Sequence, residues 1–169
     1  DGLVVELALL DLLRVRGEVL HRLVASARDR RLRPVLEQLN EESELYPTLQ
    51  RGLAEPAALV AVPDATLFNN RTISNILLTA YHHRSPVVGF SPAYVKAGAL
   101  LAPYSTPAQI GQQAGEAARQ GLATGSLPPP AAPRHFRVGT NLYVARSLGI
   151  VLDDANLLRE RLERSEGGP

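Results

Sequence analysis

The feature that most constrains the fold is a run of six apolar residues, Ala57–Val62, closed at once by Pro63 and Asp64. A short, continuous apolar run that ends in turn residues is typical of a central parallel strand buried on both faces. A second run, Val87–Phe90, follows a segment of helical periodicity that stops before Pro86. The sequence therefore predicts a βαβ unit at the middle of the chain.

The same alternation extends to both sides of this unit. Leu3–Leu10 fits either a buried strand or the start of a helix, and we prefer the strand. Pro34 confines the strand expected over Leu32–Leu39 to a sheet edge or an irregular start, and Ser43 is expected to cap the following helix. The other expected strand covers 136–138. The first expected helix begins at Glu18, and others cover 43–54, 72–83, 141–148 and 154–164. A further helix is expected to open at Thr106 and Pro107 and to end near Gly121 to Gly125.

Strands and helices that alternate in this way predict an α/β fold with a three-layer, doubly wound and mostly parallel sheet. With 169 residues the chain has room for one domain of ordinary size. We expect a single lobe over 1–169, with a core over 18–125, a proline-rich connector over 126–135, and a terminal strand and helices over 136–169.

Composition and motifs argue against several functions. A net charge of +1, with no basic run among aromatic residues, gives nucleic acid little to bind. The chain has no cysteine, and the adjacent His82 and His83 lack the i, i+4 spacing of helical metal ligands. Ser91 lacks the second glycine of a nucleophile elbow, and no phosphate loop follows any strand. We therefore predict a non-catalytic protein with no cofactor.

The apolar stretch Leu3–Leu13 is interrupted by two carboxylates and is shorter than the roughly 20 residues of a membrane span. The chain opens with Asp1 and Gly2 rather than with Met or a basic signal region, so we expect a mature or trimmed form.

Ligands of doubly wound sheets bind outside the carboxyl ends of the strands. This places Pro63–Asn70, Ser91–Lys96 and the turn around Asn40 at the candidate site. Asp64 ends the best strand and follows a proline. Its carboxylate fits equally well a ligand contact with an ammonium group and a structural role in the turn.

Three segments together resemble the substrate-binding proteins of ABC transporters, which have the type I periplasmic-binding fold. They are Val62–Asn70 (VPDATLFNN), Pro86–Ala99 (PVVGFSPAYVKAGA) and Thr140–Ile150 (TNLYVARSLGI). The order and spacing of these segments over Leu32–Ile150 are more specific than any single motif.

The resemblance implies two α/β lobes joined by a hinge, which close over a small organic solute such as an amino acid in the periplasm. An ABC permease would then be a partner. Asn141 is expected to cap a helix or act at the hinge. Carried over position by position, the residues that would face the cleft are Asp64, Phe68, Asn69, Ser91 and Tyr94.

The chain departs from this family in length, because family members have roughly two domains of ordinary size and the match covers the second lobe. Without a first lobe, half of the cleft wall is missing. Two functions stay open: a solute-binding component or lobe of an ABC-type importer, or a receptor-like lobe that serves as a protein-interaction or dimerisation module in the cell envelope, as a homodimer or with an envelope protein.

Overall fold

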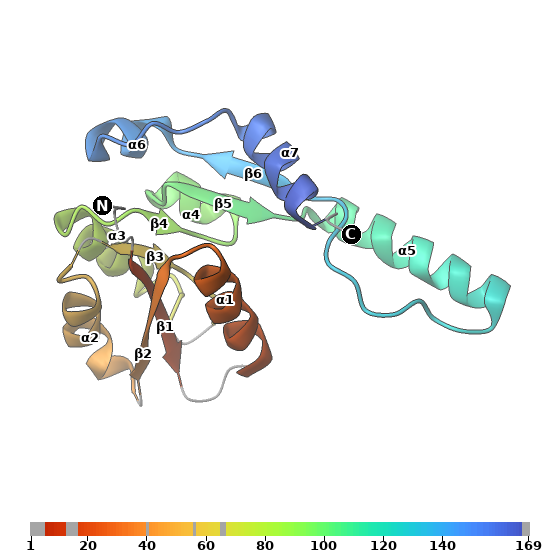
Figure 1. The fold of residues 1–169 in the computed structure, drawn as a ribbon, viewed down its shortest axis with the longest axis horizontal. Helices are drawn as coiled ribbons and strands as arrows, with labels where there is room; N and C mark the ends of the chain where they lie inside the picture. Colours follow the sequence, from red (N-terminus) through yellow and green to blue (C-terminus); the bar gives the residue numbers. More distant parts are fainter. Residues whose placement is uncertain (1–5, 13–16, 40, 56, 65–66, 167–169) are drawn as a thin grey trace.

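The computed structural model describes residues 6–12, 17–39, 41–55, 57–64 and 67–166 (Figure 1). Its centre is a six-stranded sheet in the order β2-β1-β3-β4-β5-β6. The first five strands are parallel, and β6 runs antiparallel to β5. The strands are β1 (Glu6–Leu12), β2 (Arg33–Leu39), β3 (Ala57–Val60), β4 (Val87–Val88), β5 (Leu101–Tyr104) and β6 (Arg137–Thr140).

The helices are α1 (Gly17–Asp29), α2 (Leu45–Gly52), α3 (Ile73–His82), α4 (Pro92–Ala97), α5 (Pro107–Thr124), α6 (Leu142–Leu148) and α7 (Ala155–Glu166). The chain steps one way from β1 to β2 and the other way from β2 through β5. Right-handed crossovers then place α1 on one face of the sheet and α2, α3 and α4 on the other. In Figure 1, α1 and α2 lie on opposite sides of β1 and β2, and α2, α3 and α4 contact one another in sequence. The predicted three-layer, mostly parallel α/β lobe is confirmed.

The strand preferred near the N-terminus is present as β1, although residues 1–5 lie outside the described part of the chain. Pro34 is in β2, which is an edge strand as expected. The prediction that Ser43 caps a helix is wrong. A 3-10 turn, η1 (Glu42–Glu44), takes up Ser43 before α2 begins, and the residue preceding α2 is therefore Glu44.

The core lies between the sheet and the layer formed by α2, α3 and α4. The periodic leucines that predicted α2 all point into it, with Leu45, Leu49 and Leu53 exposed by 7%, 1% and 1%. From the sheet side, β3 alternates buried and half-buried residues, and Leu59 is fully enclosed. The apolar run that predicted this strand is thus at the centre of the molecule.

Helix α6 begins and ends where the sequence predicted. Asn141 accepts hydrogen bonds from the backbone N–H groups of Tyr143 and Val144, each at 3.1 Å, and thereby caps α6. Gly149 ends this helix with a φ of 70°, a left-handed conformation that glycine adopts without steric cost. The expected capping role of Asn141 is confirmed. No helix among the described residues is long and apolar enough to cross a membrane.

Gly89, just after β4, allows helix α4 to approach the sheet closely. A Cβ at this position would lie 2.6 Å from the Cβ of Tyr94 and 3.1 Å from its Cγ. Neither atom can move without displacing α4, because Tyr94 is itself buried in the core.

We therefore expect Gly89→Ala to lower the free energy of unfolding by about 1–3 kcal/mol, the usual cost of forcing extra atoms into a packed core. Urea denaturation should show a lower midpoint with an unchanged slope. The control is Gly111→Ala in α5, where no described atom lies within 4 Å of the added Cβ. A helix-interior glycine costs up to about 1 kcal/mol relative to alanine, so this control should be neutral or stabilising. Equal midpoints for both variants would contradict the account.

Candidate functional site

The candidate site lies where β3 and β4 end. These strands are parallel neighbours, with Leu59 opposite Val87 and Val60 opposite Val88. Asp64 follows β3 by four residues and Ser91 follows β4 by three, so both positions emerge at the same edge of the sheet. The sheet thus brings together the two loops that the sequence placed at the site.

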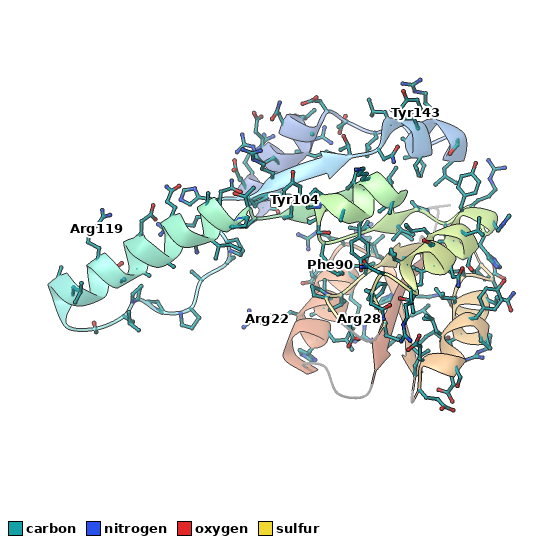
Figure 2. The ribbon with its side chains drawn as sticks, turned by 180° about the vertical axis from the view of Figure 1, so that it is seen from behind. Arg22, Arg28, Phe90, Tyr104, Arg119 and Tyr143 are labelled. Carbon is teal, nitrogen blue, oxygen red and sulfur yellow. The ribbon has the colours of Figure 1, made fainter. Side chains whose placement is uncertain are left out.

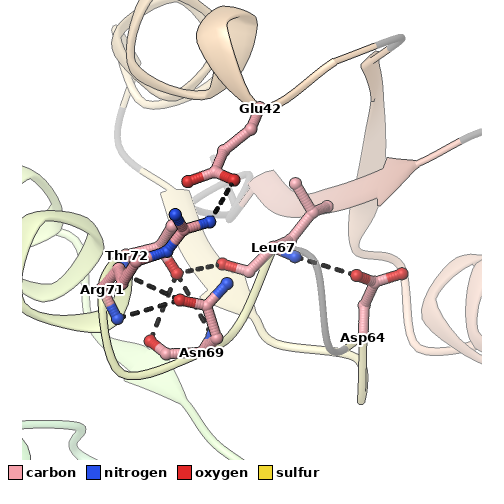
Figure 3. Close-up of polar contacts among 6 residues, drawn as sticks. All are labelled: Glu42, Asp64, Leu67, Asn69, Arg71 and Thr72. Atoms are coloured by element: carbon pink, nitrogen blue, oxygen red, sulfur yellow. Dashed lines mark hydrogen bonds and ion pairs between the residues drawn. The ribbon is translucent and has the colours of Figure 1, made fainter.

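The side chain of Asp64 holds the loop after β3. Its Oδ1 accepts a hydrogen bond from the backbone N–H of Leu67 at 2.8 Å, and its carbonyl accepts one from Phe68 at 2.9 Å (Figure 3). Asp64 as a whole is half-buried. Of the two roles that the sequence left open, the structural one is present, and it does not exclude contact with a ligand.

Asn69 and Thr72 tie the far end of this loop to the start of α3. The Asn69 Oδ1 accepts hydrogen bonds from the backbone N–H groups of Arg71 at 2.9 Å and Thr72 at 3.3 Å. The Thr72 hydroxyl donates to the carbonyl of Leu67, which is part of the turn that Asp64 holds. As Figure 3 shows, these contacts form one continuous network among the described residues of the loop, 64 and 67–72.

An ion pair that the sequence did not reveal joins two loops of this edge. The guanidinium of Arg71 lies 2.8 Å from the carboxylate of Glu42, which precedes α2 (Figure 3). Both groups are largely solvent-exposed, so the pair contributes little to stability. It places one positive and one negative charge beside the candidate site. The 29-residue separation of the partners gives no local sequence signal for it.

Three aromatic rings support the same edge from below. Phe90 and Tyr94 have ring centroids 4.5 Å apart, and Phe68 meets Phe90 edge-on at 6.3 Å. The Tyr94 hydroxyl donates a hydrogen bond to the carbonyl of Phe68 at 2.9 Å. Phe68 and Tyr94 are only 6% and 8% exposed, so they offer a solute little surface and mainly fix the loops above them.

Phe90 is the aromatic residue that the site prediction left out. It is half-buried, lies against both other rings, and immediately precedes Ser91. The sequence could have indicated Phe90 as a residue of the site, because it is the last residue of the strand predicted over Val87–Phe90. Ser91 is the extended residue before α4, and its hydroxyl makes no capping hydrogen bond.

Three cavities lie away from these residues, and the smallest, of about 360 Å³, lies between the end of β5, the connector and α7. One of about 840 Å³ lies between α5 and the proline-rich connector, and one of about 540 Å³ lies between β6, α7 and the start of α5. Within the described residues, no group of three or more histidine, cysteine, aspartate or glutamate side chains is arranged to hold a metal.

Burial raises the pKa of the Tyr94 hydroxyl above its ordinary range. An unfolded tyrosine has a pKa of about 10, so the folded state keeps this proton when the unfolded state has lost it. The resulting stabilisation is complete below pH 10 and is lost as the pH rises through the folded-state pKa.

Tyr94→Phe should therefore be less stable than the wild type by about 1–2 kcal/mol at pH 7, because the buried Phe68 carbonyl loses its donor. We expect this difference to shrink above pH 10. Urea denaturation of both proteins from pH 7 to 11.5 measures it. A difference that stays constant across this range would contradict the raised pKa.

The sheet order and the antiparallel sixth strand define a single, doubly wound and mostly parallel α/β lobe. Three solved structures share this fold. They are a conserved domain protein from Vibrio cholerae (22% identity, TM-score 0.69), an ABC domain in complex with L-Trp from Streptococcus pneumoniae (17%, 0.68), and the ligand-free, open structure of a substrate binding protein with adhesive properties from Clostridium difficile (15%, 0.66).

The matches cover 92%, 98% and 89% of this chain but only 53%, 56% and 52% of the three proteins. The chain therefore spans about half the length of each. No family model matches the sequence, and no curated protein matches it. At these identities the likeness establishes the fold, and the function has to be argued from the residues of this chain.

Proposed function

We propose that this chain is the solute-binding component, or one lobe of it, of an ABC-type importer, and that it binds a small organic solute such as an amino acid reversibly in the periplasm. The observation that supports the proposal is the parallel pairing of β3 with β4, because the loops that carry Asp64 and Ser91 follow these strands at the same edge of the sheet. This edge is the position at which doubly wound sheets bind their ligands.

The residues at this edge suit an amino acid. The Asp64 carboxylate would accept hydrogen bonds from the ammonium group of the solute, and the Ser91 hydroxyl would bond to its polar atoms. Asn69 lies at the far end of the loop that begins at Asp64, and the hydrogen bond from Tyr94 to the carbonyl of Phe68 links this loop to α4. None of this requires covalent chemistry, in keeping with a non-catalytic binder.

The fold of the neighbours supports the same proposal. The Streptococcus structure is a complex with L-Trp, and the Clostridium protein is described as a substrate binding protein. An amino acid is therefore the first class of solute to test, with L-Trp among the candidates. Because a single strand-end edge encloses a solute from one side, we expect weak binding compared with pockets that bury 70–90% of a ligand.

Thermal unfolding with a panel of L-amino acids tests this proposal. A solute present at about 100 times its dissociation constant should stabilise the chain by about 2.7 kcal/mol. Asp64→Ala should abolish the shift. The matched control is Asp154→Ala, because Asp154 also accepts a hydrogen bond from a nearby backbone N–H, that of Asn156 at 2.8 Å, but lies at the start of α7. A flat melting temperature across the panel, or an equal loss in both variants, would count against the proposal.

The second candidate function is a protein-interaction or dimerisation module in the cell envelope. It is favoured by the apolar side chains exposed around α5, since Ile110, Leu122 and Leu127 are 59%, 89% and 76% exposed. Apolar surface of this kind often marks a protein contact. Under this function the chain forms a homodimer or binds an envelope protein, and Asp64→Ala leaves that association unchanged.

Sedimentation equilibrium at several protein concentrations separates the dimer from the monomer. A dimer weakened by Ile110→Asp would support the second function. A strict monomer at high protein concentration would contradict a function in dimerisation.

A further inference from the structure

The cavity of about 540 Å³ between β6, α7 and the start of α5 is lined by three arginines, Arg134, Arg137 and Arg159. We call it the arginine cavity. Tyr104, the last residue of β5, forms part of its wall, and Figure 2 shows this residue where α5 leaves the lobe. None of the lining residues belongs to the candidate site described above. The arginine cavity is therefore a separate hollow in which positive charge gathers.

Two of the three arginines are already paired with carboxylates. The guanidinium of Arg134 lies 2.8 Å from the carboxylate of Glu116. Hydrogen bonding from Gln112 and the positive charge of Arg134 lower the pKa of Glu116 and keep it ionised. Arg159 forms an ion pair with Glu163, one turn further along α7. These four charges offset one another.

Arg137 is the arginine of this cavity whose charge is not offset. It is exposed at the start of β6 and makes no hydrogen bond or ion pair with any other described residue. The other basic residue of the wall, His135, lies 3.6 Å from Glu116 and adds charge only when it is protonated. The cavity thus suits a monoanion. A carboxylate fits a guanidinium especially well, because it accepts two parallel hydrogen bonds from it.

One face of α7 forms a wall of the arginine cavity. Asn156, Arg159 and Glu163 line the cavity and are spaced by three and four residues, which places them on the same side of the helix. Helix α7 packs against β6, as Figure 1 shows, so this face and Arg137 belong to neighbouring elements. The exposed side-chain amide of Asn156 supplies further hydrogen-bond donors for an anion.

Two aromatic residues join the arginine cavity to the cavity of about 360 Å³. Tyr104 and Phe136 line both cavities, and both residues are half-buried. Apart from Ser105, the other residues of the smaller cavity are apolar, namely Pro103, Ala132, Pro133 and Leu162. A ligand that fills both cavities therefore has a charged group at one end and an apolar body at the other. Aromatic rings pack favourably against a ring of such a ligand.

We propose that these two adjoining cavities form a second binding site, which takes a small aromatic monocarboxylate. The carboxylate accepts hydrogen bonds from the guanidinium of Arg137 and the amide of Asn156, and the ring packs against Tyr104 and Phe136. This inference goes beyond the proposed function, because no residue of the edge that carries Asp64 takes part.

Fluorine NMR with para-fluorobenzoate tests the site. The probe has one carboxylate and one ring, and its dissociation constant follows from the broadening of its signal on titration with the chain. Arg137→Ala should weaken binding about tenfold or more, because a charged hydrogen-bonding partner of the carboxylate is lost. The matched control is Arg119→Ala. Arg119 is also exposed and makes no hydrogen bond or ion pair with the described residues, but it lies far along α5 (Figure 2).

Two further compounds separate the charge from the ring. Para-fluorobenzyl alcohol keeps the ring without the charge and should bind about tenfold or more weakly than para-fluorobenzoate. Acetate keeps the charge without the ring and should displace para-fluorobenzoate only at a concentration about tenfold higher or more, because it buries less apolar surface. Equal binding of the alcohol would overturn the role of Arg137. Displacement by equimolar acetate would overturn the role of the rings.

Asn156→Asp keeps the proposal testable if Arg137→Ala does not fold. An acidic residue in the first turn of α7 favours the helix, so this variant should be at least as stable as the wild type. It also adds a negative charge to the arginine cavity, and binding of para-fluorobenzoate should fall about tenfold or more.

Three results would overturn the proposal. One is an unchanged dissociation constant in both Arg137→Ala and Asn156→Asp. Another is the absence of any broadening in the wild type at a probe concentration of about 1 mM. The third is a loss of probe binding in Asp64→Ala, because the probe would then occupy the candidate site at the strand ends.

Discussion

The parallel pairing of β3 with β4 is the constraint on which the rest of the structure depends. Parallel strands deliver their carboxyl ends to one edge, and here the loops after these strands meet there. A slip of one residue in either strand would turn its buried side chains to the opposite face. Leu59, which is fully enclosed, would lose its place in the core. The burial that stabilises the sheet therefore also fixes the positions of Asp64 and Ser91.

Most polar groups at this edge maintain its shape. Asp64 accepts a hydrogen bond from the backbone N–H of Leu67, and Asn69 accepts hydrogen bonds from the backbone N–H groups of Arg71 and Thr72. Tyr94 reaches across from α4 to the carbonyl of Phe68 and so links the loop after β3 to the element after β4. A binding edge whose side chains are held by such contacts loses little conformational entropy when a ligand arrives. Structural and binding roles are thus compatible in the same residues.

The sequence predicted every strand of the sheet except β5, because the signals of the other strands are local. Apolar runs and proline or glycine stops set the strands and helices, and Pro34 correctly indicated an edge. The roles at the site were harder to predict. Phe68 and Tyr94 lie in loop and helix segments whose inward or outward direction depends on contacts 26 residues apart. The prediction that Ser43 caps α2 was wrong because a 3-10 turn precedes this helix. The neighbouring polar residues did not indicate that turn.

The orientation of α5 could not be predicted for a related reason. Its residues have a clear apolar face, but periodicity does not say which surface covers that face. In this lobe the connector binds the polar side through Gln113 and Arg134, so the apolar side turns away from the sheet. An amphipathic helix held in this way presents hydrophobic area to water, which is unfavourable by roughly 25 cal/mol per Å² until something covers it.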